Sequence, residues 1–255
     1  MARTNKRFGW VPDLPDHRDH MYAAPLRVVT ALPPKADLRS KCPPVVDQGQ
    51  LGSCTANAIG NAHRFNQIKQ SQPGDFMPSR LFIYYNERVM EGTVGEDSGA
   101  MIRDGIKSIA QLGVCPEKMW PYQIAKFTTK PLAACYKEAL KHQAISYQRV
   151  VQTLAQMKGC LASGYPFVFG FTVYESFQSP AVAKTGTVPM PGHGEKVLGG
   201  HAVLAVGYDD SKQRFIVMNS WGTGWGAKGY FTLPYGYLTD SNLADDLWTV
   251  RTVEV

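Results

Sequence analysis

Apolar residues recur at helical spacing through the first half of the chain. Between about residues 54 and 69, Ala58, Ala62 and Phe65 fall on one helical face. Ser53 directly precedes this segment, where its hydroxyl is expected to cap the first turn. Further helices are predicted over residues 79–89, from about 98 to 113, over 132–142 and within 150–162. Helices are therefore expected to dominate the first half.

After Gly164 the pattern changes to short apolar and aromatic runs separated by turn-rich stretches, which is typical of strands. Residues 209–211, Asp-Asp-Ser, are predicted to join two of these strands as a hairpin. The strands are predicted over residues 166–174, 201–209, 214–220, 229–235 and 248–255. Helices first and antiparallel strands later indicate an α+β fold with two lobes, over about 50–150 and 151–255.

Residues 1–36 are rich in proline and show neither helical nor strand periodicity, so we expect an extended arm ahead of a domain over 37–255. Several of its apolar residues would not usefully be exposed on a free tail, namely Trp10, Val11, Leu14, Met21 and Tyr22. Two interpretations stay open: a regulatory segment that partly obstructs a cleft between the lobes, or a brace on the back of the domain. The Asp-His-Arg-Asp-His run at 16–20 is interpreted as a solvated polar loop.

Composition excludes several function classes. The chain has 255 residues, 44% apolar and 19% charged, with a net charge of +6, an ordinary globular balance. The basic cluster at residues 3–7 is interpreted as a solvated terminus, and no zinc-finger, RNA-recognition or phosphate-loop motif occurs. No run reaches the ~18 apolar residues that cross a bilayer. We expect a monomer with neither a nucleic-acid nor a membrane partner.

The N-terminus has a basic start but no apolar signal-peptide core, so a cytoplasmic location, or export without a classical signal, is expected. The five cysteines are too few for a disulfide scaffold and contain no C-x-x-C pair. Cys115 and Cys135 could bridge a loop, and Cys160 is expected to lie buried on a helix. The simpler interpretation is that all three are reduced.

Residues 48–55, Gln-Gly-Gln-Leu-Gly-Ser-Cys-Thr, put Cys54 at the start of a predicted helix. Helix N–H groups and the positive end of the dipole favour a thiolate there, and an imidazolium would complete the activation. His201 is the candidate partner, because Asn219 on the next strand can accept from one ring nitrogen and leave the other for the thiolate. Trp221 would keep water from this contact. The alternatives for Cys54 are a structural thiol and a zinc ligand, but asparagine is not a usual zinc ligand.

Three blocks carry a family resemblance, in this order: QGQLGSC at 48–54, GGHAVLAVGYDD at 199–210 and VMNSWGTGWGAKGYF at 217–231. Together they resemble the papain-like cysteine peptidases, from about Asp37 to near the C-terminus. The stretches GWVPDLPDHRDH and NLADDLWTV are similar to a bacterial branch of that family. The resemblance implies a helical lobe, a lobe like an antiparallel β-barrel, and an active-site cleft between them.

The resemblance also implies a thiol protease, a hydrolase that cleaves peptide or protein substrates through a thioester acyl-enzyme on Cys54. His201 would act as base and then acid, with Asn219 orienting its ring. Gln48 would donate to the oxyanion together with the backbone N–H of Cys54, although it could instead only cap a turn. The family mechanism needs no cofactor and no metal.

The sequence departs from papain beside the nucleophile. Papain has a cysteine at the position of Leu51 and a tryptophan at that of Thr55, so one family disulfide is absent here. Ser-Gly-Ala at residues 98–100 also stands where two adjacent glycines are usual. The candidate substrate-binding residues are Gly52, Gly99, Ala100, Gly200 and Trp221, with Met101, Ile102, Gly170 and Ala202 as a candidate apolar second subsite. The alternative for the methionine and the isoleucine is an ordinary helix core.

Two other function classes fit the same fold. An inactive peptide-binding or inhibitory module would keep the architecture, although the intact glutamine, cysteine, histidine and asparagine argue against it. An acyltransferase or transpeptidase would form the same thioester but exclude water from it. The sequence does not separate that activity from hydrolysis.

Overall fold

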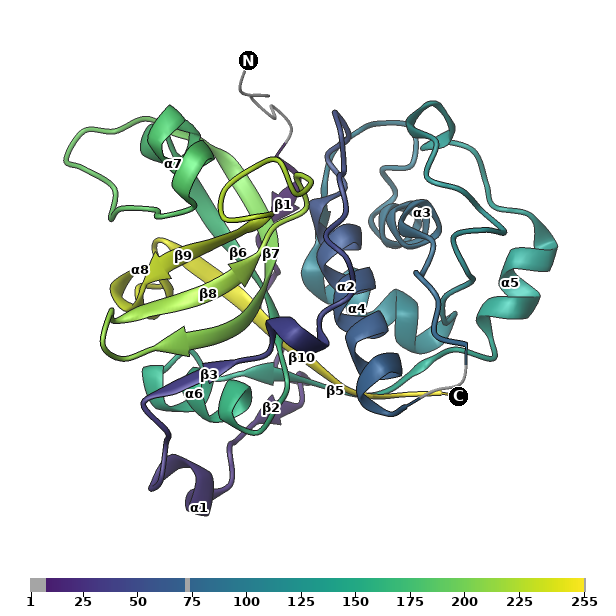
Figure 1. The fold of residues 1–255 in the computed structure, drawn as a ribbon. Helices are drawn as coiled ribbons and strands as arrows, with labels where there is room; N and C mark the ends of the chain where they lie inside the picture. The colour runs from purple at the N-terminus through teal and green to yellow at the C-terminus, as the bar shows by residue number, and fades with distance from the viewer. Residues whose placement is uncertain (1–7, 72–73, 255) are drawn as a thin grey trace.

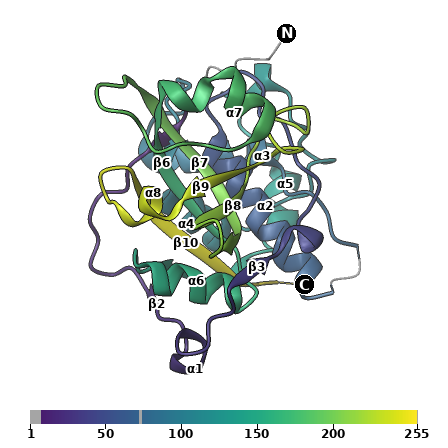
Figure 2. The same ribbon diagram turned by 60° about the vertical axis from the view of Figure 1, so that its left-hand side comes forward.

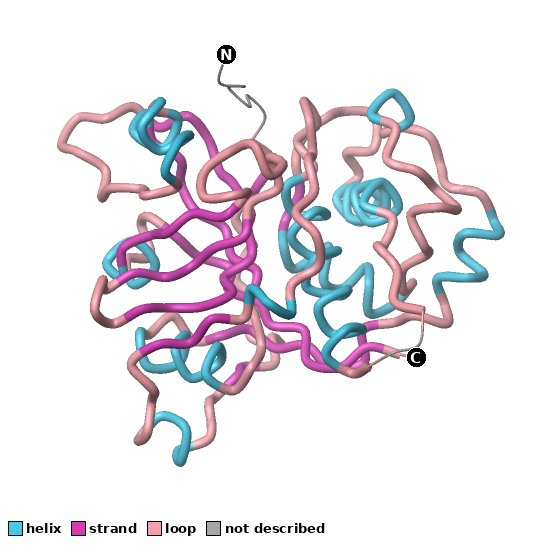
Figure 3. The backbone as a smooth tube through the Cα atoms, viewed as in Figure 1, coloured by secondary structure: helices cyan, strands magenta, loops and turns pink. Residues whose placement is uncertain are grey.

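The computed structural model describes residues 8–71 and 74–254. These residues form a mainly helical lobe and a lobe built on a sheet, which lie side by side (Figures 1 and 3). The helices are α1 (Leu26–Val29), α2 (Cys54–Lys69), α3 (Arg80–Glu91), α4 (Ile102–Gln111), α5 (Ala133–Ala139), α6 (Leu154–Ala162), α7 (Pro180–Thr185) and α8 (Tyr235–Thr239). Single 3-10 turns cover Arg39–Lys41, Ile124–Lys126 and Glu175–Gln178.

The strands of the described residues form two sheets. They are β1 (Trp10–Val11), β2 (Met21–Tyr22), β3 (Lys35–Asp37), β4 (Ala100–Met101), β5 (Ala144–Val150), β6 (Phe167–Tyr174), β7 (Val197–Asp209), β8 (Arg214–Met218), β9 (Tyr230–Pro234) and β10 (Ala244–Val253). The large sheet has the order β2-β5-β10-β6-β7-β8-β9, with β3 paired to β7. It stays open, so the expected barrel-like closure is wrong, while the α+β class and the two lobes are confirmed. The β7–β8 connection is the predicted hairpin.

Helix α2 has the predicted limits and runs between the lobes (Figure 1). It is buried on most sides because it packs against α3 and α4 on one side and against β7 and β10 on the other. The expected cap is wrong: the Ser53 side chain accepts no capping hydrogen bond from a backbone N–H of the first turn, and its Oγ lies 2.6 Å from the Tyr122 hydroxyl. The start of α2 is therefore held by tertiary contacts.

Helix α4 begins at Ile102 rather than near residue 98. The reason is β4, whose residues Ala100 and Met101 are extended and pair with β1 of the arm. Gly113 follows the C-cap with φ of 73°, the left-handed conformation that the predicted stop requires. The chain thus enters α4 directly from a strand that faces the arm.

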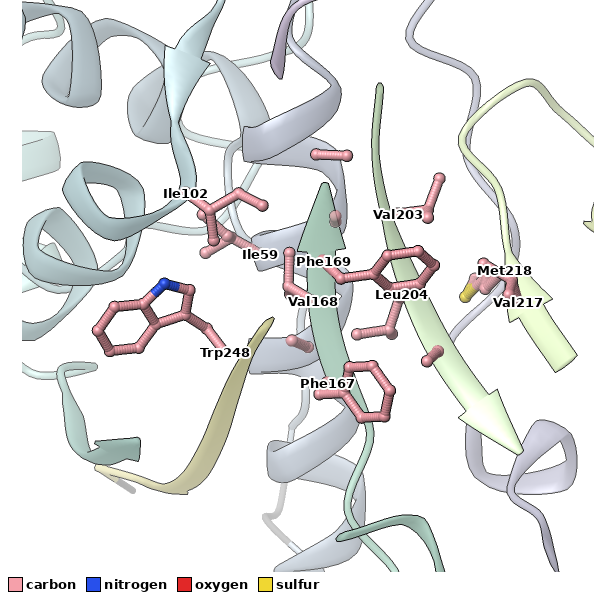
Figure 4. Close-up of a cluster of buried hydrophobic side chains, with 14 of the residues drawn as sticks. Ile59, Ile102, Phe167, Val168, Phe169, Val203, Leu204, Val217, Met218 and Trp248 are labelled. Carbon is pink, nitrogen blue, oxygen red and sulfur yellow. The ribbon is translucent and has the colours of Figure 1, made fainter. Parts of the chain in front are cut away.

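The core joins the two lobes through aromatic and branched side chains (Figure 4). Phe167, Val168 and Phe169 on β6 are fully buried, and Ile59 of α2 and Ile102 of α4 lie in the same cluster. Consecutive buried residues on β6 mean that both faces of this strand are covered, because side chains alternate across a sheet. Both lobes therefore pack against one central part of the sheet.

The described part of the arm, which starts at Phe8, adds strands at three places. Strand β1 pairs in parallel with β4, β2 in parallel with β5, and β3 antiparallel with β7. Figure 2 shows the arm passing down the outside of the sheet lobe to α1. Tyr22 is buried as expected, but Leu14 and Met21 are 67% and 52% exposed, so the expectation that the arm hides all its apolar residues is wrong.

A buried ion-pair cluster anchors the arm. The side chains of Arg103 and Asp19 are only 5% and 7% exposed, and their closest atoms, Nη2 and Oδ2, are 2.6 Å apart. Arg103 Nη1 also donates to the carbonyl of Leu14. Arg149 approaches the same Asp19 carboxylate at 3.4 Å. The polar run at 16–20 is therefore not simply solvated, because Asp19 bridges two arginines of the domain.

Candidate active site

Cys54 opens α2 at the junction of the lobes and is fully buried. Its Sγ accepts a hydrogen bond from the backbone N–H of Ala202, at 3.4 Å. The N–H of Gly9, from the arm, also points at the sulfur. The structure thus brings Cys54 against the strand residue that directly follows His201.

His201 lies on β7, also fully buried. Its Nε2 is 2.9 Å from Asn219 Oδ1, which also accepts from the N–H of Ser220. Because that oxygen can only accept, Nε2 carries the proton, and Nδ1 has no hydrogen-bond partner within the described residues. The Trp221 ring centroid lies 5.0 Å from the imidazole and covers it. The predicted histidine, asparagine and tryptophan therefore meet.

Gln48 is held by the second lobe as well as by its own loop. Its backbone N–H donates to Ser220 O at 2.8 Å, and its Oε1 accepts from the Ser220 hydroxyl at 2.6 Å. Its Nε2 donates to Leu51 O at 2.9 Å. Gly49, with φ of 63°, allows the turn that brings this side chain back toward the start of α2. These contacts of Gln48 are thus made by Ser220, which follows Asn219, and by Leu51, in the loop that leads to Cys54.

Burial controls the protonation of the central pair. Removal from water raises the pKa of the Cys54 thiol to about 12, and the N–H groups of Ala202 and Gly9 oppose this rise. Burial also lowers the pKa of the His201 imidazole to about 4, while its bond to Asn219 acts in the opposite direction. Both shifts favour the neutral thiol and the neutral imidazole in this buried arrangement.

The arm lies over the candidate substrate-binding backbone. The N–H of Ala100 donates to Gly9 O at 2.8 Å. A Cβ at Gly170 would lie 2.0 Å from the Trp10 ring, and one at Gly200 would lie 2.6 Å from the Trp10 carbonyl. These three candidates thus form one surface, and the glycines are required for the close approach of a chain.

The other candidates divide between cleft and core. A Cβ at Gly99 would lie 2.2 Å from Gly9 O, and a Cβ at Gly9 would lie 1.7 Å from the carbonyl oxygen of Gly52. Met101 is half-buried. Ile102 is fully buried in the core cluster, where its alternative interpretation as a core residue accounts for it. Ala202 contacts the sulfur through its backbone, as described above.

Sequence reasoning missed two acidic residues at this site. Asp246 Oδ2 accepts from Trp10 Nε1 at 2.9 Å and from the backbone N–H of Asp13 at 2.7 Å. Asp97 accepts from the backbone N–H of Gly52 at 2.9 Å. No local pattern marks these contacts, because the partners lie up to 236 positions apart.

Within residues 8–71 and 74–254, no three histidine, cysteine, aspartate or glutamate side chains gather in a way that could hold a metal ion. Among the same residues, no helix has the length and apolarity needed to cross a membrane. All five cysteines are free thiols, including Cys115 and Cys135.

The comparisons with known proteins identify the family. Residues 32–249 match the family described as papain family cysteine protease. The chain therefore belongs to this family, and it is a cysteine peptidase, a hydrolase that cleaves peptide bonds.

A crystal structure of xylellain, a cysteine protease from Xylella fastidiosa, is a structural neighbour, which agrees with the predicted similarity to a bacterial branch. Its crystal structure aligns with a TM-score of 0.91 and 47% identity, covering 100% of this chain and 99% of that one. An uncharacterised peptidase C1-like protein of Acanthamoeba polyphaga mimivirus is 44% identical over 98% of this chain and 88% of its own length. Chymopapain from Carica papaya is 30% identical over 86% of this chain, which spans 58% of that relative.

Proposed function

We propose that this peptidase works through Cys54 as nucleophile, with His201 as base and acid, Asn219 as orienting residue and Gln48 in the oxyanion hole. The observation that carries the proposal is the junction of β7 with α2. There the Ala202 N–H contacts the sulfur, and the preceding histidine is bonded to Asn219 through one nitrogen only. The other nitrogen is left for the thiol proton.

In the proposed reaction His201 Nδ1 takes the thiol proton, and Sγ attacks the peptide carbonyl carbon to form a C–S bond. The oxyanion receives hydrogen bonds from the Gln48 amide and the Cys54 N–H, and each such donor is typically worth about 3 kcal/mol. The C–N bond then breaks as the imidazolium protonates the leaving amine. Water, deprotonated by His201, hydrolyses the thioester to a carboxylate and restores the thiol.

Labelling by an epoxide inhibitor of cysteine peptidases, measured by intact mass, tests this assignment. We expect one adduct on the wild type and none on Cys54→Ala, with peptide hydrolysis lost in Cys54→Ala and His201→Ala. A folded wild type without adduct would instead indicate an inactive binding module. Labelling without hydrolysis, but with product when an amine is added, would indicate acyl transfer.

We further propose that residues 8–13 of the arm inhibit the peptidase by occupying its substrate cleft. The support is the overlap between the arm contacts and the candidate substrate-binding backbone at Ala100, Gly170 and Gly200. The Phe8 ring also lies 6.1 Å from the His201 ring. Strands β2 and β3 later in the arm extend the sheet, so that part acts as a brace in either case.

Removal of residues 1–30 tests the inhibition. If the deletion variant is folded by thermal melting, its kcat/KM for a short fluorogenic peptide should exceed that of the full chain. A stable variant with unchanged kcat/KM would contradict inhibition. The expected monomer, and the cytoplasmic or signal-independent location, stay predictions; light scattering after gel filtration tests the first.

A further inference from the structure

The peptide unit between Leu51 and Gly52 is held at both of its polar ends. Its carbonyl oxygen, on Leu51, accepts from Gln48 Nε2 at 2.9 Å. Its N–H, on Gly52, donates to the Asp97 carboxylate, at 2.9 Å to Oδ1 and 3.2 Å to Oδ2. Because the peptide unit is planar, the side chain of Asp97 and the amide of Gln48 are connected through one rigid group.

Asp97 is in turn held by a buried tyrosine of α3. The Tyr84 hydroxyl donates to Asp97 Oδ1 at 2.6 Å and accepts from the N–H of Gly99 at 3.2 Å. Burial, together with the neighbouring carboxylate, raises the pKa of Tyr84, so the phenol keeps its proton and remains a donor. One carboxylate therefore connects the loop before Cys54 with the segment that leads into β4.

The hydrogen bonds of Asp97 hold this loop at a place where papain has a disulfide. Leu51 stands at the position of a papain cysteine, so the corresponding disulfide cannot form here. The neighbouring glycine is also required by the contact, because a Cβ at Gly52 would lie 2.9 Å from Asp97 Oδ1. The loop is thus attached by hydrogen bonds to an anion, which are stronger than those between neutral groups.

We propose that Asp97 is a positioning residue for the oxyanion hole: it fixes the Leu51–Gly52 peptide, and through it the Gln48 amide. The proposal rests on the role of Gln48 proposed above. Asp97 itself touches neither the sulfur nor the substrate in this role. Through Tyr84, Asp97 also holds Gly99, which faces the cleft. The Gln48 end of the network should therefore affect kcat, and the Gly99 end should affect KM.

The test compares two reactions of the same sulfur in the full chain. Acylation by a peptide substrate needs the oxyanion hole, whereas alkylation by iodoacetamide forms no oxyanion and does not need it. Both reactions require the arm to leave the site. The ratio of the acylation rate to the alkylation rate is therefore independent of how easily the arm opens. In Asp97→Ala, kcat should fall about 10- to 100-fold while the alkylation rate changes less than about threefold.

Three variants make the result specific. Asp97→Asn keeps an Oδ1 that accepts from both Gly52 N–H and the Tyr84 hydroxyl, so it should recover most of kcat. Tyr84→Phe should raise KM more than it lowers kcat, because it loosens Gly99 first. Asp240→Ala is the matched control, since Asp240 likewise accepts a backbone N–H, from Asn242, but lies between α8 and β10.

The double variant Gln48→Ala/Asp97→Ala decides the mechanism. If Asp97 acts through the Gln48 amide, the double variant should be no slower than Gln48→Ala alone, within about threefold. The proposal would be overturned if the reductions in kcat of the two single variants multiplied in the double variant, or if Asp97→Ala kept a normal kcat. An equal fall in the alkylation rate of Asp97→Ala would also overturn it, because the substitution would then have damaged the site as a whole. Normal kcat in Gln48→Ala would instead refute the assignment of Gln48 to the oxyanion hole.

Discussion

Trp10→Ala gives the sharpest test of the arm's role. The Trp10 ring packs against Gly170 and Gly200, and its Nε1 donates to Asp246 at 2.9 Å. Replacing it with alanine removes the ring and the hydrogen bond but leaves the rest of the arm in place. The docked arm should therefore lose affinity for the cleft without loss of the sheet strands β2 and β3.

The size of the effect follows from these contacts. Truncation of a buried tryptophan costs about 3–5 kcal/mol, and a hydrogen bond to a charged group contributes about 1.5–3 kcal/mol of such a loss. Trp10 is only half-buried, so we take the lower end, about 3 kcal/mol. This value shifts the equilibrium between covered and open sites about a hundredfold. The observed rate then rises until most molecules are open.

The assay measures the second-order rate of epoxide labelling at Cys54, and in parallel the turnover of a fluorogenic peptide. Trp10→Ala should raise both, and the labelling rate should reach its half-maximum at a lower pH, because returning water lowers the pKa of the buried thiol. Leu14→Ala is the control, since Leu14 is an exposed arm residue. A stable Trp10→Ala variant that reacts no faster than Leu14→Ala would refute the reasoning.

The remaining predictions concern the anchor and the stability of the domain. Asp19→Ala removes the partner of Arg103, so it should raise the labelling rate of Cys54, whereas Asp75→Ala, which loses an exposed ion pair with Arg64, should not. Burial lowers the pKa of His63 to about 3, so below about pH 6.5 only the unfolded chain takes up this proton. Wild-type stability should fall on acidification by up to ~1.4 kcal/mol per pH unit from this group, and His63→Gln should melt with a flatter pH dependence. Gly105→Ala should lower the melting temperature, because its Cβ would lie 2.3 Å from Ile59 Cδ1; an unchanged temperature would show that the core yields there.

Local pattern was enough for some of the regular elements, but it did not predict β5 or the short helices α1, α7 and α8. The limits of α2 and the β7–β8 hairpin follow from periodicity and turn residues. Local pattern failed where the interacting residues are distant in the sequence. Helix α4 starts later than predicted because the chain before Ile102 pairs with the arm. Ser53 bonds to Tyr122 instead of capping its helix. Helix propensity and capping are weak preferences that tertiary contacts readily override.

The catalytic candidates were readable from the sequence because Cys54, His201 and Asn219 stand in blocks whose residue types suit the chemistry. The sequence alone determined this set of candidates, the family and the division into a mainly helical lobe and a sheet lobe. Only the tertiary structure decided that Gly9 and Trp10 pack against Ala100, Gly170 and Gly200, and that Asp246 and Asp97 accept hydrogen bonds from Trp10 and Gly52. Those contacts join residues up to 236 positions apart, and an acidic side chain carries no local mark of the backbone N–H that it will meet.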